Sequence, residues 1–254
     1  MKIFPLLNKE LKIAFSSATA YVTFTVFLLI VGYLFVGQSL MLAKESFAYG
    51  ATGTSVMDAI FRVLFHDAAV ILLFLTPAMT MRLLAEEKRA GTLELLLTYP
   101  LNDLEIILAK FCSAFASVVI FLLPTILYSI FIQRFAPIEW SVLATQYLGI
   151  LLLCGSYIAV GLWASHLTDN QIVAATLTIG ILLGLWLIAW IGQSSPLASW
   201  SVVLGQLSIL NHFDSFSKGV LNTSDITFYL LLILFFLYVT LKGLESRSWW
   251  GRSE

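Results

Sequence analysis

Residues 142–165 read VLATQYLGILLLCGSYIAVGLWAS, a run that contains no charged side chain. A helix needs about 20 mostly apolar residues, each adding about 1.5 Å, to cross the roughly 30 Å hydrocarbon core of a bilayer. The run is long enough and apolar enough to do so. It therefore predicts a membrane-spanning helix.

The whole sequence has the same character. Of its 254 residues, 59% are hydrophobic and 11% are charged, whereas soluble domains carry roughly 25% charged residues. The length fits one membrane domain, residues 1–254, and a net charge of −1 gives no reason to expect nucleic acid as a partner. Cys112 and Cys154 lie in apolar runs without metal-ligand spacing, so we expect them to be packing residues.

Six apolar runs are long enough to cross a membrane. They are Ala20–Leu42, Ala68–Leu84, Ile106–Ile132, Val142–Ser165, Ile172–Ile191 and Ile226–Leu244. The second is short, and we expect it to continue outward through Ile60–Asp67. The predicted fold is all-α and polytopic, with six transmembrane helices in residues 18–244 and a cytoplasmic tail at 245–254.

The distribution of lysine and arginine predicts the orientation. If the N-terminus is inside, the inner segments hold ten of these residues and the outer segments hold four. The inner ones are Lys2, Lys9, Lys12, Arg82, Lys88, Arg89, Lys110, Lys242, Arg247 and Arg252; the outer ones are Lys44, Arg62, Arg134 and Lys218. Cytoplasmic loops of membrane proteins carry the excess of positive residues. Both termini are therefore predicted to be cytoplasmic.

The segment before the first span is amphipathic. Apolar residues including Leu7, Leu11 and Phe15 fall on one helical face, while Lys9 and Lys12 lie opposite. Such a helix lies in the membrane interface, with its lysines toward lipid headgroups. Residues 1–17 are predicted to form this interfacial helix, either as a simple anchor or with a mechanical role as well.

Two smaller features lie within the spans. Arg62, His66 and Asp67 cluster at the outer end of the second span, where they form either an interfacial salt-bridged anchor or a substrate contact. Gly180 and Gly184 form a GxxxG pattern in the fifth span, which allows close approach of another helix. We expect these glycines to serve packing within the chain.

The connection between the second and third spans has a distinctive pattern. Gly91 can take the left-handed conformation that ends a helix, and Thr92 can cap a new one. Pro100 stops that helix, and Asn102 with Glu105 resembles a capping box that opens the third span. The pattern predicts a short cytoplasmic helix before Pro100.

Leucines crowd this short helix. They are Leu93, Leu95, Leu96 and Leu97. So many leucines cover most of the circumference of a short helix, and a membrane surface alone would bury only part of them. A partner protein surface is expected, although a helix that lies flat on the bilayer also fits the spacing.

The run EEKRAGTLELLLTYP at 86–100 resembles the first cytoplasmic loop of ABC type-two permeases, exporters with six spans in each half. In that family the loop is a coupling helix that docks on the ATPase subunit. The matching coupling residues would be Glu86, Glu87, Arg89, Gly91, Thr92, Leu93, Glu94, Leu96 and Leu97. The resemblance also makes residues 1–17 the connecting helix and Ser165–Gln171 the second inner loop.

The resemblance implies the partners as well. Six spans form half of a pathway in this family, so a second copy or a similar permease is expected, together with two cytoplasmic ATPase subunits. The sequence contains no GxxxxGK motif followed by Ser or Thr. No cofactor is expected in this chain, because ATP and Mg²⁺ would be bound by the ATPase. The expected location is a bacterial inner membrane.

An outer segment points to a narrower group. Residues 193–224 are too polar to span and are predicted to lie outside. Residues 211–220, NHFDSFSKGV, and the ending LESRSWW at 244–250 are similar to the gliding-motility-associated ABC permeases. The run 91–100 is also similar to the permease that helps nitrous oxide reductase to mature. The outer-face candidates are His212, Phe213, Asp214, Phe216 and Gly219.

The outer residues allow several roles. Phe213 and Phe216 suit a short helix that lies at the outer interface or re-enters a dimer cavity, and plain aromatic anchoring fits equally. An accessory protein on the outer face is a further possible partner.

Three function classes remain open. A permease fits the six spans and the leucine-rich loop. A secondary transporter would need ionisable residues at mid-membrane or broken inverted repeats, and neither pattern is seen in the sequence. A membrane assembly or mechanotransmission subunit, which shares the fold but moves no solute, fits the same features.

Overall fold

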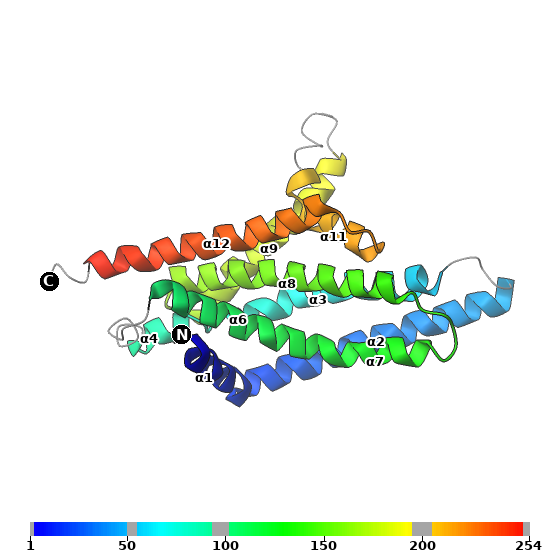
Figure 1. Ribbon diagram of the computed structural model, residues 1–254, viewed down its shortest axis with the longest axis horizontal. Helices are drawn as coiled ribbons and strands as arrows, with labels where there is room; N and C mark the ends of the chain where they lie inside the picture. Colours follow the sequence, from blue (N-terminus) through cyan, green and yellow to red (C-terminus); the bar gives the residue numbers. More distant parts are fainter. Residues whose placement is uncertain (1–2, 50–54, 93–101, 195–204, 251–254) are drawn as a thin grey trace.

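The computed structural model describes residues 3–49, 55–92, 102–194 and 205–250, which are helical apart from short connections (Figure 1). The helices are α1 (Ile3–Ser16), α2 (Ala18–Tyr49), η1 (Met57–Arg62), α3 (Val63–Thr80), α4 (Ala85–Arg89), α6 (Asp103–Leu122), η2 (Leu123–Thr125), α7 (Ile126–Ile132), α8 (Trp140–Leu167), α9 (Gln171–Ser194), α11 (Ile209–Ser217) and α12 (Thr223–Trp250).

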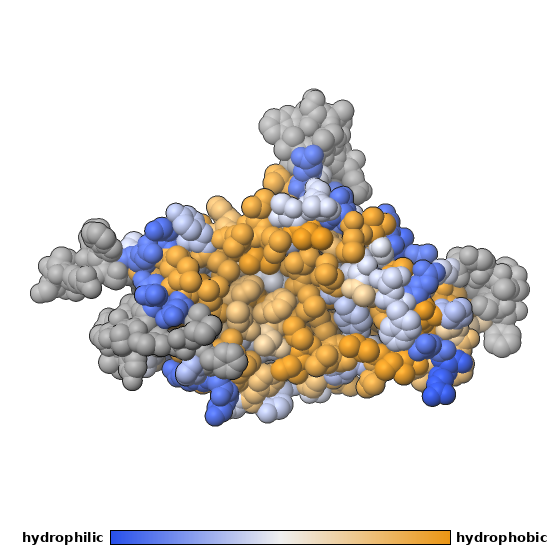
Figure 2. Space-filling model, in the orientation of Figure 1, coloured by the Kyte–Doolittle hydropathy of each residue, from blue (hydrophilic) through white to orange (hydrophobic). Residues whose placement is uncertain are grey.

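Six helical stretches are long and apolar enough to cross a membrane. They are Ala18–Lys44, Met57–Arg89, Asp103–Ile132, Trp140–Leu167, Gln171–Ile188 and Thr223–Ser246. Figure 2 shows the broad apolar belt that they form, with hydrophilic residues gathered toward both ends of the bundle. The all-α fold with six spans is thereby confirmed, and the second span begins at Met57, as its expected outward extension requires.

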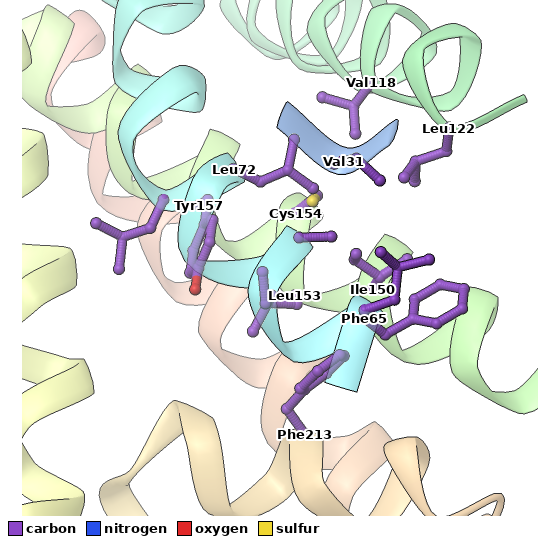
Figure 3. Packing of buried hydrophobic residues seen from close by; sticks show 14 of the residues in the cluster. Val31, Phe65, Leu72, Val118, Leu122, Ile150, Leu153, Cys154, Tyr157 and Phe213 are labelled. Carbon is purple, nitrogen blue, oxygen red and sulfur yellow. The ribbon is translucent and has the colours of Figure 1, made fainter. Parts of the chain in front are cut away.

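The core of the bundle lies around α8. This helix packs against α12, α3, α9, α11 and α6, and it is the most buried of the six spans. Leu72 from α3, Val118 from α6, and Cys154 from α8 meet in one hydrophobic cluster (Figure 3). Cys154 is fully buried there, as its predicted packing role requires, whereas Cys112 is exposed.

Pro124 interrupts the third span. Because proline has no backbone N–H, it cannot continue the hydrogen-bond ladder of an α-helix. The chain passes from α6 through the 3₁₀ turn η2 into α7, and the whole stretch Asp103–Ile132 remains one candidate span. The sequence predicted this span but not its break.

One prediction gains a structural detail and another needs correction. Helix α12 continues to Trp250, so the first six residues of the predicted tail 245–254 are helical. A Cβ atom added to Gly180 or Gly184 would meet nothing within 4 Å in the described part of the chain. The expected packing role of these glycines inside the chain is therefore wrong. Gly180 and Gly184 are exposed, whereas Leu182 between them is fully buried, so the glycines lie on the face of α9 that points away from the core.

The two ends of the bundle carry different elements. The N-terminal helix α1, the short helix α4 and the C-terminal end of α12 lie at one end, which we call the terminal end (Figure 1). The connection between α7 and α8 lies at the opposite end, which we call the far end. That the terminal end faces the cytoplasm stays a prediction.

Candidate functional site

The second span ends in a helix, a turn and a second short helix. Helix α3 stops at Thr80, a turn covers Met81–Leu84, and α4 follows. Gly91 has a φ of +68°, which confirms the left-handed conformation expected at the helix end. Thr92 donates its hydroxyl back to the Glu87 carbonyl at 3.3 Å. The predicted capping role of Thr92 concerns the following helix, which lies outside the described residues.

Ser165 at the end of α8 holds the turn between α3 and α4. Its Oγ accepts hydrogen bonds from the backbone N–H groups of Leu84, at 3.1 Å, and Ala85, at 2.9 Å. It donates to the Met81 carbonyl at 3.0 Å. These backbone groups are buried and would otherwise lack partners, so one hydroxyl replaces the hydrogen bonds lost where the helix breaks.

A second contact ties α4 to the same region of α8. The Lys88 ammonium group donates to the backbone carbonyl of His166. His166 is buried, and a Cβ atom on Gly243 of α12 would lie 2.8 Å from its Cδ2. The predicted second inner loop, Ser165–Gln171, therefore contacts α4 and lies close to α12 through its first two residues.

A buried ion cluster joins α4 to two further helices. The Lys110 Nζ lies 2.7 Å from Glu87 Oε1 and 3.5 Å from Glu10 Oε2. The Lys110 side chain is 2% exposed and that of Glu10 is 7% exposed. We call Lys110, Glu10 and Glu87 the Lys110 triad. It links α6, α1 and α4 although its members are far apart in sequence.

The Lys110 triad matters energetically because its charges are out of water. Removing one partner of a buried ion pair typically costs about 3–5 kcal/mol, since the remaining charge stays buried without compensation. The triad was not predicted from the sequence. The available signal was Lys110 itself, which lies about two turns inside an otherwise apolar helix, where an ionisable residue is costly and usually functional.

Helix α1 packs firmly on the bundle. Its Leu6 is buried against Ile106 and Ala109 of α6, and Arg82 donates from Nη1 to the Ser17 hydroxyl at 2.9 Å. Lys9 and Lys12 are exposed, as predicted for the polar face. The buried face of α1 includes Glu10 in addition to apolar residues, which the amphipathic pattern did not predict.

The remaining coupling candidates fall into two groups. Glu86, Arg89, Gly91 and Thr92 are exposed beside α4, and Arg89 shares a surface groove with residues 168–170 of the α8–α9 loop. Four other predicted coupling residues lie outside the described residues: Leu93, Glu94, Leu96 and Leu97. Beyond them, Asn102 and Glu105 form the predicted capping box at the start of α6.

A charged cluster occupies the far end. Asp214 of α11 accepts a hydrogen bond from Arg62 at 2.9 Å, pairs with Lys218, and lies 3.9 Å from His66. Burial acts to raise the pKa of Asp214, but the hydrogen bonds and charges of Lys218 and Arg62 outweigh it and lower the pKa. Arg62 is therefore half of an ion pair between η1 and α11, whereas Asp67 accepts from Gln38 at 3.0 Å.

His212 sits in a separate polar contact. Its Nδ1 lies 2.5 Å from Asp225 Oδ1, and its Nε2 lies 2.9 Å from the Gln206 carbonyl. The imidazole also stacks on the Phe228 ring, with 4.0 Å between centroids. His212 thus connects the start of α11 to the start of α12.

Helix α11 is more buried than the sequence suggested. Phe213 and Phe216 are both 0% exposed, and Figure 3 shows Phe213 directed toward the core residues Leu153 and Phe65. Both rings pack inside the protomer, so they do not act as exposed aromatic anchors, and the position of α11 at the outer face or in a dimer cavity stays a prediction. Gly219 follows with a φ of +78° and allows the chain to turn close to Val142.

Comparison with known proteins agrees with this architecture. The sequence model of the family described as "ABC-2 family transporter protein" matches residues 4–244. A comparison with curated proteins found no match. The family match covers every candidate span apart from the last two residues of the sixth. Six apolar spans, an N-terminal helix packed on the bundle and this match together place the chain in the ABC-2 family of transporter proteins.

Proposed function

We propose that this chain is the permease subunit of an ATP-driven exporter and that a separate cytoplasmic ATPase docks on residues 86–100. Membership of the ABC-2 family supports a permease that lacks an ATPase activity of its own and works with a partner ATPase. In this proposal the terminal end faces the cytoplasm of a bacterial cell, and the membrane is the inner membrane.

One observation carries the coupling role: the short helix α4 is attached to three different helices. Glu87 pairs with Lys110 of α6 and, through it, with Glu10 of α1. Lys88 and the backbone at Leu84 and Ala85 bind the end of α8. A movement imposed on the loop would therefore pass directly into the connecting helix and two spans, as coupling requires.

The docking surface would consist of the leucine-rich segment and its neighbours. Leu93, Glu94, Leu96 and Leu97 lie outside the described residues, so their part in docking rests on the resemblance to the coupling helix. The groove between Arg89 and residues 168–170 lies at the end of α4, which precedes that segment in the chain. It offers the ATPase a second point of contact, at the loop that resembles the second inner loop of the family.

We further infer that the permease acts as a dimer. The exposed face of α9 carries Gly180 and Gly184, which have open space beside them in this chain. Small residues at this spacing let a helix from another copy approach closely. Helix α9 is also among the least buried spans. The similarity of residues 211–220 to the gliding-motility-associated permeases supports, as part of this proposal, membership of that group.

The test is co-purification with the ATPase, combined with ATP turnover in reconstituted membranes. Leu96→Asp should abolish docking, because a leucine contributes about 1.5–3 kcal/mol of apolar burial and an aspartate adds a charge that must be desolvated. Glu94→Arg should weaken docking by placing a positive charge at the positive end of a helix dipole. Asp169→Asn, in the neighbouring loop, tests the second contact.

The outcomes separate the open function classes. Normal ATPase binding and turnover in both Leu96→Asp and Glu94→Arg would refute the coupling role. If the rate of ATP turnover changes with an outer-face protein but with no candidate solute, the result would instead favour a mechanotransmission subunit.

A further inference from the structure

A cavity of about 460 Å³ opens at the terminal end between α1, α2, α3, α4 and α6. Ligand sites for small molecules have volumes of about 300–1,000 Å³ and combine an apolar lining with a few convergent polar groups. This cavity has both. Ile13, Met79 and Leu83 supply apolar surface, and the Lys110 triad lies in its wall.

The charge of the triad is unbalanced. One ammonium group, on Lys110, faces two carboxylates, those of Glu10 and Glu87. One negative charge is therefore left over in a place where Lys110 is 2% exposed and Glu10 is 7% exposed. A buried charge is stable only when a charge of opposite sign compensates it. The lining as a whole is neutral, because Lys9 and Arg82 add two positive charges and Glu86 adds one negative charge, so the excess negative charge is local to the triad.

Two oxygen atoms in the same wall lack hydrogen-bond donors. Glu10 Oε1 and Glu87 Oε2 are buried and accept no hydrogen bond from the described residues. Buried carboxylate oxygens nearly always have a donor. Both residues line the cavity. A ligand group that carries a positive charge and N–H donors, such as a primary ammonium, would complement the local negative charge of the triad and supply hydrogen-bond donors to these oxygens.

The opposite requirement appears at Arg82. Its Nη1 donates to Ser17, but its Nε is buried and finds no acceptor among the described residues. Arg82 lines the same cavity. A guanidinium with a free N–H recognises an anionic oxygen, and phosphate oxygens suit it particularly well. The cavity therefore presents one site for a cation and one for an anion.

We propose that this cavity binds a zwitterion that carries a primary ammonium, held by Glu10 and Glu87, and a phosphate, held by Arg82. A phospholipid headgroup and a free soluble solute could both supply this chemistry. The cavity is bounded by the amphipathic helix α1 and the start of α2, and such helices lie at the headgroup level. The idea that the zwitterion is the transported substrate rests on the proposed permease function. The binding of the zwitterion to the cavity does not depend on that function.

The experiment measures binding to the purified full-length permease in detergent, without ATPase. The probes are lysophosphatidylethanolamine, lysophosphatidylcholine, lysophosphatidylglycerol and the soluble headgroup glycerophosphoethanolamine. Lysophosphatidylcholine has a cation without N–H donors, and lysophosphatidylglycerol has no cation. Both should bind at least about tenfold more weakly than lysophosphatidylethanolamine, because each loses charged hydrogen bonds to the carboxylates. Equal binding of all three lipids would overturn the proposal.

The soluble probe identifies the source of the ligand. If glycerophosphoethanolamine binds as tightly as the lipid and both depend on Glu10, the ligand chemistry stands and the source is a free solute. If only the lipid binds, the source is a lipid headgroup.

Variants test the two subsites separately. Glu10→Gln should weaken lysophosphatidylethanolamine binding about tenfold or more and leave the melting temperature unchanged or higher, because Lys110 and Glu87 then form a balanced pair. Arg82→Gln should remove the preference for lysophosphatidylethanolamine over dodecylamine, which lacks the phosphate. Glu139→Gln, an exposed change at the far end, is the matched control and should bind normally.

A purely structural triad would behave differently. Glu10→Gln would then lower the melting temperature and leave lipid binding at the wild-type value, and this result would overturn the proposal. It would not affect the coupling role, because Leu96→Asp and Glu94→Arg are scored by ATPase binding. The two hypotheses can therefore fail independently.

Discussion

Gly149 of α8 lies directly against Phe216 of α11: a Cβ atom on the glycine would come 2.8 Å from Phe216 Cγ and closer still to its Cβ. Carbon atoms pack no closer than about 3.5 Å without repulsion. The absence of a side chain at position 149 is therefore what allows α11 to enter the core. Phe216 itself is completely buried, so neither partner has space to move away.

We predict that Gly149→Ala loosens α11. Overpacking of this kind typically costs about 1–3 kcal/mol, which should lower the thermal unfolding midpoint in detergent. Gly37→Ala is the matched control, because nothing lies within 4 Å of a Cβ atom at that helical position. The control should be neutral or slightly stabilising, since alanine favours helix. Equal midpoints for the two variants would contradict the prediction.

Lys110→Met should be strongly destabilising. The change leaves the carboxylates of Glu10 and Glu87 together in a buried place without a cation, a situation that typically costs about 3–5 kcal/mol. Adding Glu10→Gln and Glu87→Gln to Lys110→Met should recover most of the loss. Lys12→Met, an exposed change on α1, provides the comparison. Unfolding midpoints that fall equally for Lys12→Met and Lys110→Met would argue against the Lys110 triad.

Acid should weaken the far-end cluster through Asp214. Its folded-state pKa lies below the ordinary value of 3.8, so protons bind the unfolded state more readily. The stabilisation is complete well above the unfolded pKa of 3.8 and is lost as the pH falls below it through the folded-state pKa. Asp214→Asn should lower the neutral-pH melting temperature and flatten this acid dependence. Glu139→Gln should retain the wild-type acid dependence of the melting temperature. If Asp214→Asn also retains it, the assignment of this dependence to Asp214 would be refuted.

Surface labelling can establish the orientation. Single cysteines at Pro137, Val220 and Asp169, all exposed, would be placed in a background in which Cys112 and Cys154 are alanine. An impermeant thiol reagent added outside intact cells should label positions 137 and 220 but not 169, which lies between α8 and α9. Labelling of position 169 before the membrane is opened would show that the true topology is the reverse of the predicted one.

Gly184→Leu should weaken the proposed dimer. A leucine would fill the open space beside α9 and hold a second copy away, while the fold of one protomer should be unaffected because nothing in the described chain contacts that position. Crosslinking or mass measurement in detergent gives the oligomeric state. The control is Gly37→Leu on α2, where the space is also open. A dimer that survives Gly184→Leu would exclude this face.

The features that were predicted from the sequence are those determined by residues close together in the chain. A run of apolar residues such as 142–165 forms a membrane-length helix whatever it packs against. The capping box from Asn102 to Glu105 covers four residues, and the conformation of Gly91 depends on its own lack of a side chain. The capping box and the conformation of Gly91 follow from chemistry within about one helical turn, and the span follows from the composition of its own run.

The features that sequence missed depend on distant contacts. Lys110 and Glu10 are 100 residues apart in the sequence, and the residues around either one do not predict its contact with the other. The aromatic residues of α11 looked like interface anchors because that segment is polar overall, but Gly149 on another helix makes room to bury them. The small space beside a remote glycine cannot be inferred from the α11 segment alone.

The turn at Met81–Leu84 has a mechanical consequence. A continuous helix is stiff because successive backbone hydrogen bonds tie every turn to the next, but here the N–H groups of Leu84 and Ala85 have left that ladder and bind Ser165. Helix α4 is therefore not a rigid extension of α3: a rotation between them would exchange side-chain bonds, those of Ser165, Lys88 and Glu87, without unwinding either helix.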